Sequence, residues 1–263
     1  MEPLYILTRT SGRPEFFRRC RESVKSLQWP GGVVHIVHID DPRSERYVEC
    51  DIIVKGTAHG PNMGTAPYNL YNNRLLKAIP SSGWVAFLDD DDEYVEPDVF
   101  ERVLGDKPDP KKIYICKAMR WNDTIWPRKW GTQSSFQTEC FVVHSTIAVT
   151  AKWWGDKGGD HAYTRQLTRR HIPLVWRDVL VAKAQEGKGH GKLIDIGGEL
   201  MDMDDYPPNE IVWVKLHRDG LGRNYGKPVQ MTFAEGRVFE KHNVGRVTFK
   251  GVEICDLRSR KTA

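Results

Sequence analysis

The sequence predicts an α/β protein, with a mostly parallel sheet covered by helices on both faces and a small β-rich C-terminal region after it. Two patterns lead to this prediction. Over roughly the first 180 residues, short runs of bulky apolar residues alternate with segments whose apolar residues recur at helical spacing, as in strand–helix–strand units. After about residue 200, short apolar runs are separated by glycine turns, and no helical pattern lies between them.

The chain opens with a predicted strand and helix. Leu4–Thr8 has the length and apolar content of a short strand, and Ser11–Pro14 is typical of the turn that ends it. Pro14 suits the first turn of a helix, where its missing N–H costs little. Apolar residues then recur at helical spacing, at Phe16, Phe17, Cys20, Val24 and Leu27.

The following elements continue the alternation. Val33–Ile39 and Ile52–Val54 are predicted strands, and the glycine-rich loop Gly56–Gly64 leads into a helix with an apolar side around Leu75. Trp84–Leu88 is apolar throughout, as a strand buried on both faces would be. Beyond it we expect helices over Pro97–Leu104 and His161–Arg170 and strands over Ile113–Met119, Cys140–Thr150 and Leu174–Ala182.

The C-terminal region has a different composition. Asp202–Pro208 is polar and contains prolines, as linkers do, so we expect one domain over residues 1–200 and a second region over 201–263. From Pro207 onward there are eleven Lys and Arg against six Asp and Glu, which makes this region basic. The short strands expected in it are Ile211–Leu216, Val229–Phe233, Arg237–Phe239 and Val247–Ile254.

The composition limits the class of protein. The formal charge of +4 is too small to imply nucleic acid binding by itself, although it suits an anionic ligand. The five cysteines are widely spaced, with no CxxC pair, which favours reduced thiols and a cytosolic setting. No apolar run approaches the roughly 20 residues that span a bilayer, and the N-terminus lacks a signal-peptide core. We therefore expect a cytoplasmic protein with no membrane span.

The strongest chemical signal is the run Asp89–Asp92, which directly follows the buried strand Trp84–Leu88. Ligands of open α/β sheets collect at the carboxyl ends of strands. On an extended segment Asp89 and Asp91 would point the same way and together attract Mg²⁺ or Mn²⁺. The alternative is a solvated acidic turn with no ligand.

Two other predicted strands end in charged residues. Asp40 and Asp41 follow Val33–Ile39, and Arg9 and Arg13 follow the first strand. In a parallel sheet these strand ends meet at one edge, where arginines and a metal would neutralise a nucleotide diphosphate and Asp40 would accept a hydrogen bond from a base N–H. Alternatively, Arg13 is merely solvated and Asp41 caps the turn before the next proline.

These segments, LYILTRTSGRPEFF, VVHIVHIDD and APYNLYNNRLLKAIPSSGWVAFLDDDDEY, resemble the nucleotide-binding half of family 2 glycosyltransferases of the GT-A fold. The resemblance covers about residues 3–170 and implies a Rossmann-like sheet, with a nucleotide-sugar half over about 1–95 and an acceptor half over about 96–200. Carried over by position, it implies that Asp40 contacts uracil, that Asp89 and Asp91 form the Asp-x-Asp pair, and that Asp91 is the direct metal ligand. The remaining donor-binding residues that we expect are Thr8, Arg9, Arg13, Asn69 and Asp90.

The resemblance also implies a catalytic aspartate at the start of a later helix. In TAKWWGDKGGDHAYTRQL that position is Asp160, although Gly159 stands where the family usually has Glu. Asp160 is equally suited to cap that helix, and capping alone would explain it. Asp156 and His161 are alternatives for the base, and His161 is also a candidate for acceptor binding.

Two further segments contain candidate ligand contacts. In AQEGKGHGKL, Lys188 and His190 are placed to close over a diphosphate, and His190 is a candidate third metal ligand; a solvated hairpin is the alternative. In RWNDTIWPRKW, tryptophans alternate with basic residues and are candidates to stack an acceptor, or else belong to the core. These tryptophans are Trp121, Trp126 and Trp130.

The sequence therefore predicts a metal-dependent, inverting glycosyltransferase that moves a sugar from a nucleotide sugar, expected to be a UDP-sugar, to an acceptor hydroxyl. The acceptor is open: a glycan, a small molecule or hydroxylated bases in DNA. A nucleotidyltransferase and a non-catalytic module that binds nucleotide sugars or nucleic acid are the alternatives from other classes. The sugar and the oligomeric state are not predicted.

Overall fold

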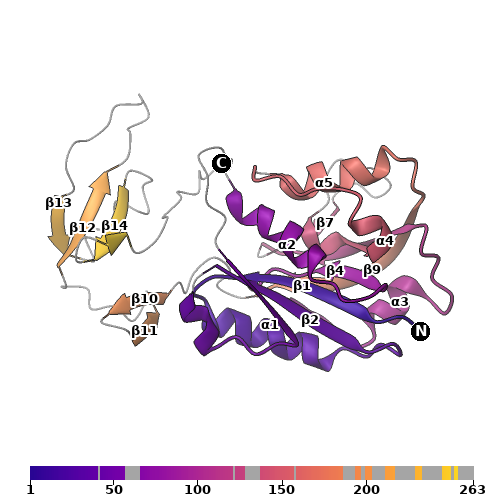
Figure 1. The fold of residues 1–263 in the computed structure, drawn as a ribbon, viewed down its shortest axis with the longest axis horizontal. Helices are drawn as coiled ribbons and strands as arrows, with labels where there is room; N and C mark the ends of the chain where they lie inside the picture. The colour runs from indigo at the N-terminus through magenta and orange to yellow at the C-terminus, as the bar shows by residue number, and fades with distance from the viewer. Residues whose placement is uncertain are drawn as a thin grey trace. The chain divides into compact units, whose positions relative to one another are not determined.

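The computed structural model describes residues 1–40, 42–56, 66–120, 122–127, 137–156 and 158–185, together with short strands between Leu193 and Glu253. The chain divides into two compact units, Met1–Gly189 and His190–Ala263. Figure 1 shows the elements of each unit.

The described part of the first unit contains a nine-stranded sheet. Its strands are β1 (Leu4–Thr10), β2 (Val33–Ile39), β3 (Ile52–Lys55), β4 (Trp84–Phe87), β5 (Asp92–Tyr94), β6 (Ile113–Met119), β7 (Ile125–Trp126), β8 (Phe141–His144) and β9 (Leu174–Ala184). Their order is β3-β2-β1-β4-β8-β6-β9-β5, with β7 paired to β6.

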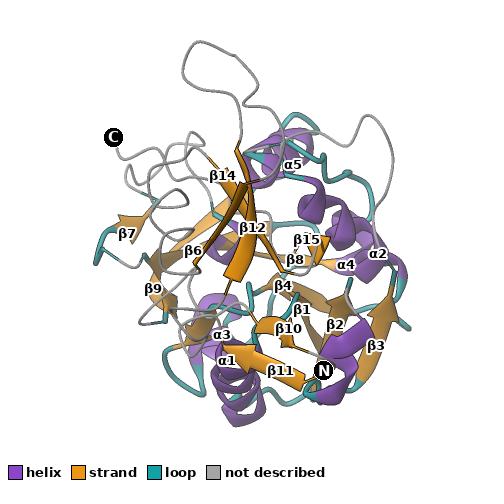
Figure 2. Ribbon diagram, turned by 90° about the vertical axis from the view of Figure 1, so that its left-hand side faces the viewer, coloured by secondary structure: helices purple, strands orange, loops and turns teal. Residues whose placement is uncertain are grey.

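Helices cover both faces of this sheet. They are α1 (Pro14–Ser26), α2 (Tyr71–Lys77), α3 (Val99–Leu104), α4 (Ser145–Ala148) and α5 (Gly159–Thr168), with 3₁₀ turns η1 (Pro42–Arg46), η2 (Pro67–Leu70) and η3 (Thr138–Cys140). Figures 1 and 2 both show α1 and α3 on one face and α2, α4 and α5 on the other. All four residues of β4 are buried because this central strand is covered on both sides.

An aromatic cluster fixes the packing of α5. Phe87 of β4 and Phe141 of β8 contact Tyr163 of α5, and the Tyr163 ring stacks on Trp153 with a centroid separation of 4.5 Å. The hydroxyl of Tyr163 donates to the carbonyl of Ala148 at 2.7 Å, so this buried phenol is satisfied. These contacts hold the N-terminal turn of α5 at a defined place beside the sheet.

The predicted α/β class is confirmed, and the sheet is mixed. β3, β2, β1 and β4 are mutually parallel, and so are β6 and β9. β8 is antiparallel to both of its neighbours, β4 and β6. No α-helix lies in the described residues between β6 and β8, and a chain that returns without a crossover helix pairs antiparallel with the strand it left.

One predicted element is wrong in part. The strand expected over Cys140–Thr150 is strand only from Phe141 to His144, and the chain then turns into the short helix α4. Ser145 makes this turn because its hydroxyl accepts the N–H of Gly83, while its own N–H donates to the Gly83 carbonyl. Of the apolar residues after it, Ala148 is buried in this helix, whereas Val149 is 57 % exposed.

The second unit is β-rich in its described residues. β10 (Leu193–Ile196) pairs with β11 (Glu199–Asp202), and a four-stranded antiparallel sheet has the order β13-β12-β14-β15. Its strands are β12 (Ile211–Leu216), β13 (Val229–Thr232), β14 (Gly245–Phe249) and β15 (Val252–Glu253). The strand predicted over 237–239 and residues 203–208 of the predicted linker lie outside the described residues. Among the described residues no helix is both long and apolar enough to cross a bilayer.

Candidate functional site

The charged residues predicted to meet at the carboxyl edge of the sheet do meet there. β1 pairs in parallel with β2 and with β4, so Arg9, Asp40 and Asp89 come from adjacent strand ends. Arg9 forms an ion pair with Asp89, which lies 80 residues away in the sequence. The parallel register of three strands therefore builds this site.

The four aspartates occupy a tight turn. The N–H of Asp92 donates to the carbonyl of Asp89 at 3.0 Å, and β5 begins at Asp92. The assumption of an extended segment, which would alternate the side chains, is therefore wrong. Because the chain turns, Asp90 and Asp91 both bind Arg13, whereas Asp89 binds Arg9.

Arg13 is fully engaged by this turn. Its Nε and Nη2 donate to the two oxygens of Asp90, and its Nη1 donates to Asp91 Oδ2 at 2.9 Å. The hydroxyl of Thr10 also donates to Asp90, at 2.7 Å. Asp90 has no exposed surface, and burial raises its pKa to about 6 even though Arg13 acts in the opposite direction.

Gln185 binds the backbone of the same turn. This buried side chain follows β9, and its Nε2 donates to the carbonyls of Phe16, Asp90 and Asp92 at 3.0, 3.3 and 3.1 Å. Its own N–H donates to the carbonyl of Asp91 at 3.0 Å. The backbone of the acidic turn is thus fixed by hydrogen bonds on one side and by Arg13 on the other.

Arg9 links the acidic turn to the segment before α5. Its Nη1 donates to Asn69 Oδ1 at 2.7 Å, and Asn69 Nδ2 donates to the carbonyl of Asp156 at 3.0 Å. The guanidinium also lies 5.2 Å from the ring centroid of Tyr68, within cation–π range. Asn69 is buried, and both the oxygen and the nitrogen of its amide are hydrogen-bonded. It therefore connects Arg9 to the segment before α5.

Gly159 explains a departure from the family pattern. A Cβ at this position would lie 2.7 Å from Asn69 Nδ2 and 2.8 Å from the carbonyl of Trp154. No side chain fits there without moving these groups. The glycine therefore lets the first turn of α5 approach Asn69 closely.

Asp160 lies in this first turn, and its predicted capping role is wrong. The N-cap is Gly158, which has a φ of 79°, and Asp160 is the second residue of α5. Its Oδ1 accepts the N–H of His161 at 2.8 Å. Burial, together with the charge of Asp89, raises the pKa of Asp160, while the His161 N–H and Arg9 act in the opposite direction. Asp160 follows Gly159, which lies against Asn69, and Asn69 in turn binds Arg9.

A cluster of carboxylates that the sequence did not single out lies beside Arg9. Asp89, Asp92 and Glu139 each offer an oxygen, and these atoms all lie within 4.8 Å of one another. Glu139 comes from η3, and only 8 % of its surface is exposed. The oxygen-only set fits Mg²⁺ or Mn²⁺. The segment around Glu139 has no motif that would have revealed it, and on an extended segment Asp92 would point away from Asp89.

Asp40 contacts α2. The hydroxyl of Tyr71 donates to Asp40 Oδ2 at 3.2 Å, and the Tyr71 ring stacks on His38. Neither Tyr71 nor His38 was predicted as a site residue. His38 could have been found from the sequence, because it stands two residues before Asp40 and therefore on the same side of β2.

Several predicted residues do not join this cluster. Thr8 is completely buried, with Oγ1 2.9 Å from His35 Nε2 on the α1 side of the sheet, so its side chain does not face the carboxyl edge. Trp126 is partly buried, and its ring lies 5.0 Å from the guanidinium carbon of Arg120. His161 follows Asp160 in α5. Asp41, Trp121, Trp130, Lys188 and His190 lie outside the described residues.

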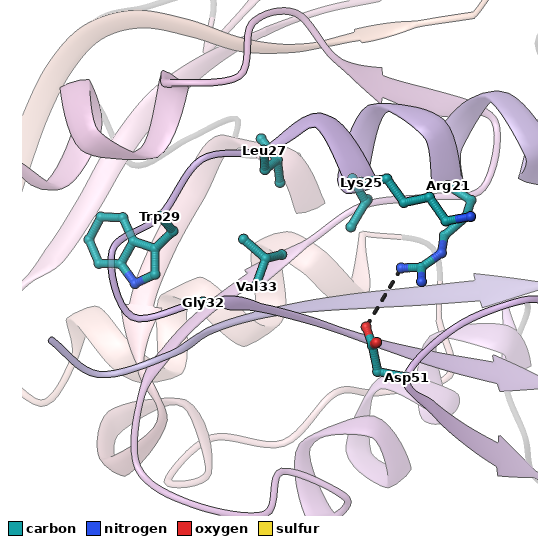
Figure 3. Close-up of a pocket in the computed structure, with 8 residues that line it drawn as sticks. Arg21, Lys25, Leu27, Trp29, Gly32, Val33 and Asp51 are labelled. Atoms are coloured by element: carbon teal, nitrogen blue, oxygen red, sulfur yellow. Dashed lines mark ion pairs between the residues drawn. The ribbon is translucent and has the colours of Figure 1, made fainter.

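A depression of about 330 Å³ lies at the other end of α1 (Figure 3). Val24 and Leu27 from the end of α1, Trp29 and the start of β2 line it, and Arg21 lies 3.6 Å from Asp51 across it. Arg13 precedes α1 and Asp40 follows β2, so this depression is at the opposite end of both elements from the charged cluster. It is separate from the candidate site.

Comparison with known proteins finds likeness in structure alone. No protein-family model matches the chain, and no curated protein matches it. Solved structures of S. aureus TarS are similar. TarS 1-349 in complex with UDP has a TM-score of 0.52 at 11 % identity, and its complex with UDP-GlcNAc has a TM-score of 0.51 at 13 % identity.

These matches cover 70 % and 72 % of this chain and 60 % of each TarS chain. The chain therefore spans less than two thirds of the structures that it matches. At this identity the likeness concerns the fold. The α/β sheet of the first unit has a GT-A-like, glycosyltransferase-like fold.

Proposed function

We propose that this protein is a glycosyltransferase that moves a sugar from a nucleotide sugar to an acceptor hydroxyl. The observation that carries the proposal is the ion pair between Arg9 and Asp89 at the carboxyl edge of a GT-A-like sheet, where Asp40 follows the adjacent strand β2 and Asn69 joins Arg9 to the segment before Asp160. Ligands of such sheets bind at this edge. That TarS has been solved with UDP and with UDP-GlcNAc supports a uridine nucleotide as the donor.

The donor would be held by charge at one end and by a directed hydrogen bond at the other. Arg9 offers a positive charge next to Asp89, where a diphosphate would bring negative charge. Asp40 would accept the N–H of the base. Arg13 is a weaker candidate for direct donor contact, because all three of its guanidinium nitrogens bind Asp90 and Asp91. Lys188 and His190 stay proposed donor contacts.

The residues present fit a divalent cation. Asp89, Asp92 and Glu139 would hold Mn²⁺ or Mg²⁺ between them. Asp91, the ligand implied by family resemblance, is the alternative partner of Asp89, but its Oδ2 accepts from Arg13. His190 stays a proposed third ligand. When bound, the ion would stabilise the charge that develops on the departing diphosphate.

Asp160 would act as the general base. It would accept the proton of the acceptor hydroxyl as that oxygen attacks the anomeric carbon, and a single displacement of this kind inverts the anomeric centre. The raised pKa of Asp160 makes it a better proton acceptor than an ordinary aspartate. Arg9 and Asn69 join the acidic turn to the carbonyl of Asp156, four residues before this carboxylate.

The acceptor is proposed only as a molecule with a free hydroxyl. Trp126 and His161 stay candidates for acceptor contact, together with Trp121 and Trp130. Hydroxylated bases in DNA stay an alternative acceptor, and binding to DNA would weaken steeply with salt because it depends on phosphate contacts.

A thermal-shift panel of nucleotide sugars, with and without Mn²⁺, tests the proposal. A ligand that binds the folded state alone raises the melting temperature, so a uridine nucleotide sugar should raise it, and more so with Mn²⁺. The Asp160→Asn variant should keep this shift and lose transfer. If no nucleotide sugar shifts the melting temperature under either condition, the proposal is wrong.

A further inference from the structure

Two aromatic residues, His38 and Tyr71, surround the carboxylate of Asp40. His38 and Asp40 stand two residues apart at the end of β2 and face α2, because side chains alternate along a strand. Tyr71, the first residue of α2, touches both. Its ring lies parallel to the His38 ring, with centroids 4.1 Å apart and an angle of 14° between the planes, and its hydroxyl donates to Asp40 Oδ2 at 3.2 Å.

The other oxygen of Asp40 accepts no hydrogen bond from the described residues. Oδ1 is buried and has no hydrogen-bond partner in the part of the chain that the structure describes. A buried acceptor without a partner is costly, and in folded proteins such groups usually have a protein, water or ligand partner. Because Tyr71 holds Oδ2, rotation of the carboxylate is restricted, and Oδ1 is the oxygen left to accept a hydrogen bond.

His38 acts here as an aromatic surface. It has no exposed surface, and neither of its ring nitrogens has a hydrogen-bond partner among the described residues. Burial, followed by the charges of Arg74 and Arg9, lowers its pKa to about 4, so the ring is neutral at physiological pH. A neutral ring stacked on Tyr71 holds the phenol in place without competing for the carboxylate of Asp40.

We propose that Tyr71, resting on His38, is a positioning residue that sets the base specificity of the nucleotide site. By holding Asp40 Oδ2, it aims Oδ1 at a base that presents a ring N–H, as uracil does at N3. Cytosine presents a lone pair at the same ring atom, and two acceptors facing each other repel. This inference rests on the proposed function, because it requires that a nucleotide occupies the site.

Calorimetric titration of UDP and CDP in the presence of Mn²⁺ tests the inference without knowledge of the sugar or the acceptor. The two ligands are nearly equal in size and differ at the atoms that Asp40 would contact. A hydrogen bond to a charged group corresponds to roughly a tenfold to hundredfold preference, so the wild-type protein should bind UDP more tightly than CDP by about that factor. Tyr71→Phe keeps the ring and removes the hydroxyl, and it should reduce the preference to about threefold or less by weakening UDP binding.

Two controls separate positioning from general damage. Tyr5→Phe removes another partly buried hydroxyl contact, the one to Ser81 at 2.6 Å at the amino end of β1, and should leave the preference for UDP unchanged. His38→Phe keeps an aromatic surface, and because the ring nitrogens of His38 have no hydrogen-bond partner in the described part of the chain, this variant should also keep the preference. The melting temperature of each variant shows whether the fold is intact.

The possible results can be told apart. If the wild-type protein binds neither nucleotide, the proposed function is wrong. If it binds UDP and Tyr71→Phe keeps the wild-type affinity and preference, the role of Tyr71 is wrong while the proposed function stands. If Tyr71→Phe binds UDP more tightly than the wild type does, Tyr71 competes with the base for its place, and the positioning role is also wrong.

Discussion

Arg9 and Arg13 lie four residues apart and bind the same run of aspartates, yet their surroundings differ. Arg13 donates hydrogen bonds from all three guanidinium nitrogens to Asp90 and Asp91, and the side chain of Asp90 is 0 % exposed. Arg9 binds Asp89, whose side chain is 28 % exposed, and reaches Asn69 and Tyr68 as well. Adjacent carboxylates in one acidic run therefore serve different purposes.

The Arg13 cluster joins the loop after β1 to the acidic turn and is satisfied by protein groups. The Arg9 cluster faces Glu139 and Asp160 and gathers the groups that a cation and a diphosphate would need. The hydrogen-bond partners therefore separate Asp90, which protein groups satisfy, from Asp89, which the proposed function assigns to the chemistry. Substitutions in the Arg13 cluster should lower stability, and substitutions in the Arg9 cluster should lower metal binding or catalysis.

The largest effect should come from Arg13→Met. Removing one partner of a buried ion pair leaves an uncompensated carboxylate, so the free energy of unfolding should fall by about 3–5 kcal/mol near neutral pH. Without Arg13 the pKa of Asp90 should rise above its present value of about 6. At pH values below this raised pKa, the folded variant holds a proton on Asp90 that the unfolded chain has lost. The destabilisation relative to the wild type should therefore grow as pH rises from about 6 toward the raised pKa, and should shrink below about 6.

Urea denaturation at several pH values measures this effect. Arg18→Met in α1, the helix that Arg13 precedes, is the matched control, because Arg18 forms exposed ion pairs with Glu15 and Glu22 and its loss should leave stability unchanged. Equal destabilisation by both variants would contradict a structural role specific to Arg13.

The next largest effect concerns the cation. Asp89→Asn should weaken Mn²⁺ binding in the presence of UDP by at least about tenfold, since even residues that only orient metal ligands have effects of this size. Asp91→Asn should change Mn²⁺ affinity little, because Asp91 Oδ2 is bonded to Arg13. Electron paramagnetic resonance of free Mn²⁺ measures both. A large loss in Asp91→Asn alone would favour the Asp-x-Asp assignment over the cluster with Asp92 and Glu139.

A smaller effect is expected where Arg9 reaches α5. Gly159→Ala would bring a Cβ within 2.7 Å of Asn69 Nδ2, and relief of this overlap should cost about 1–3 kcal/mol of stability. Asn69→Ala removes the group that the new Cβ would meet on one side. In a double-mutant cycle the second substitution should therefore add less than its separate cost, whereas strict additivity would show that the two residues do not interact.

The smallest expected effect is a change in the pKa of Asp160, which Arg9 and Arg13 should influence to different extents. Arg9 lowers the pKa of Asp160, whereas Arg13 binds Asp90 and Asp91. Arg9→Gln should therefore raise the pKa of Asp160 further, and Arg13→Met should leave it nearly unchanged, as measured by carboxyl carbon NMR. Because a general base must be ionised, Arg9→Gln should also move the acid limb of donor hydrolysis to higher pH. An equal response to both variants would contradict the separation.

The sequence was sufficient for the part of the site that depends on strand order. Apolar runs that end in charged residues predicted that Arg9, Asp40 and Asp89 would meet, because parallel strands place their carboxyl ends at one edge. β2 and β6 begin and end where they were expected. These predictions use short-range pattern and one topological rule, and both hold here.

The sequence was insufficient where the backbone leaves regular structure. The turn at Asp89–Asp92 broke the assumed alternation, because its hydrogen bonds to Gln185 join residues more than 90 positions apart. Glu139 reaches the site through the fold of a segment with no periodic pattern. The place of Tyr71 depends on how α2 docks, and no local propensity encodes this.

The most direct test is a crystal grown with Mn²⁺ and UDP, in which anomalous scattering locates the ion. The proposed function predicts a manganese peak in contact with Asp89 and with the diphosphate of UDP, and the base beside Asp40. A bound UDP whose diphosphate and metal lie away from Asp89, or a manganese peak elsewhere on the molecule, would contradict it.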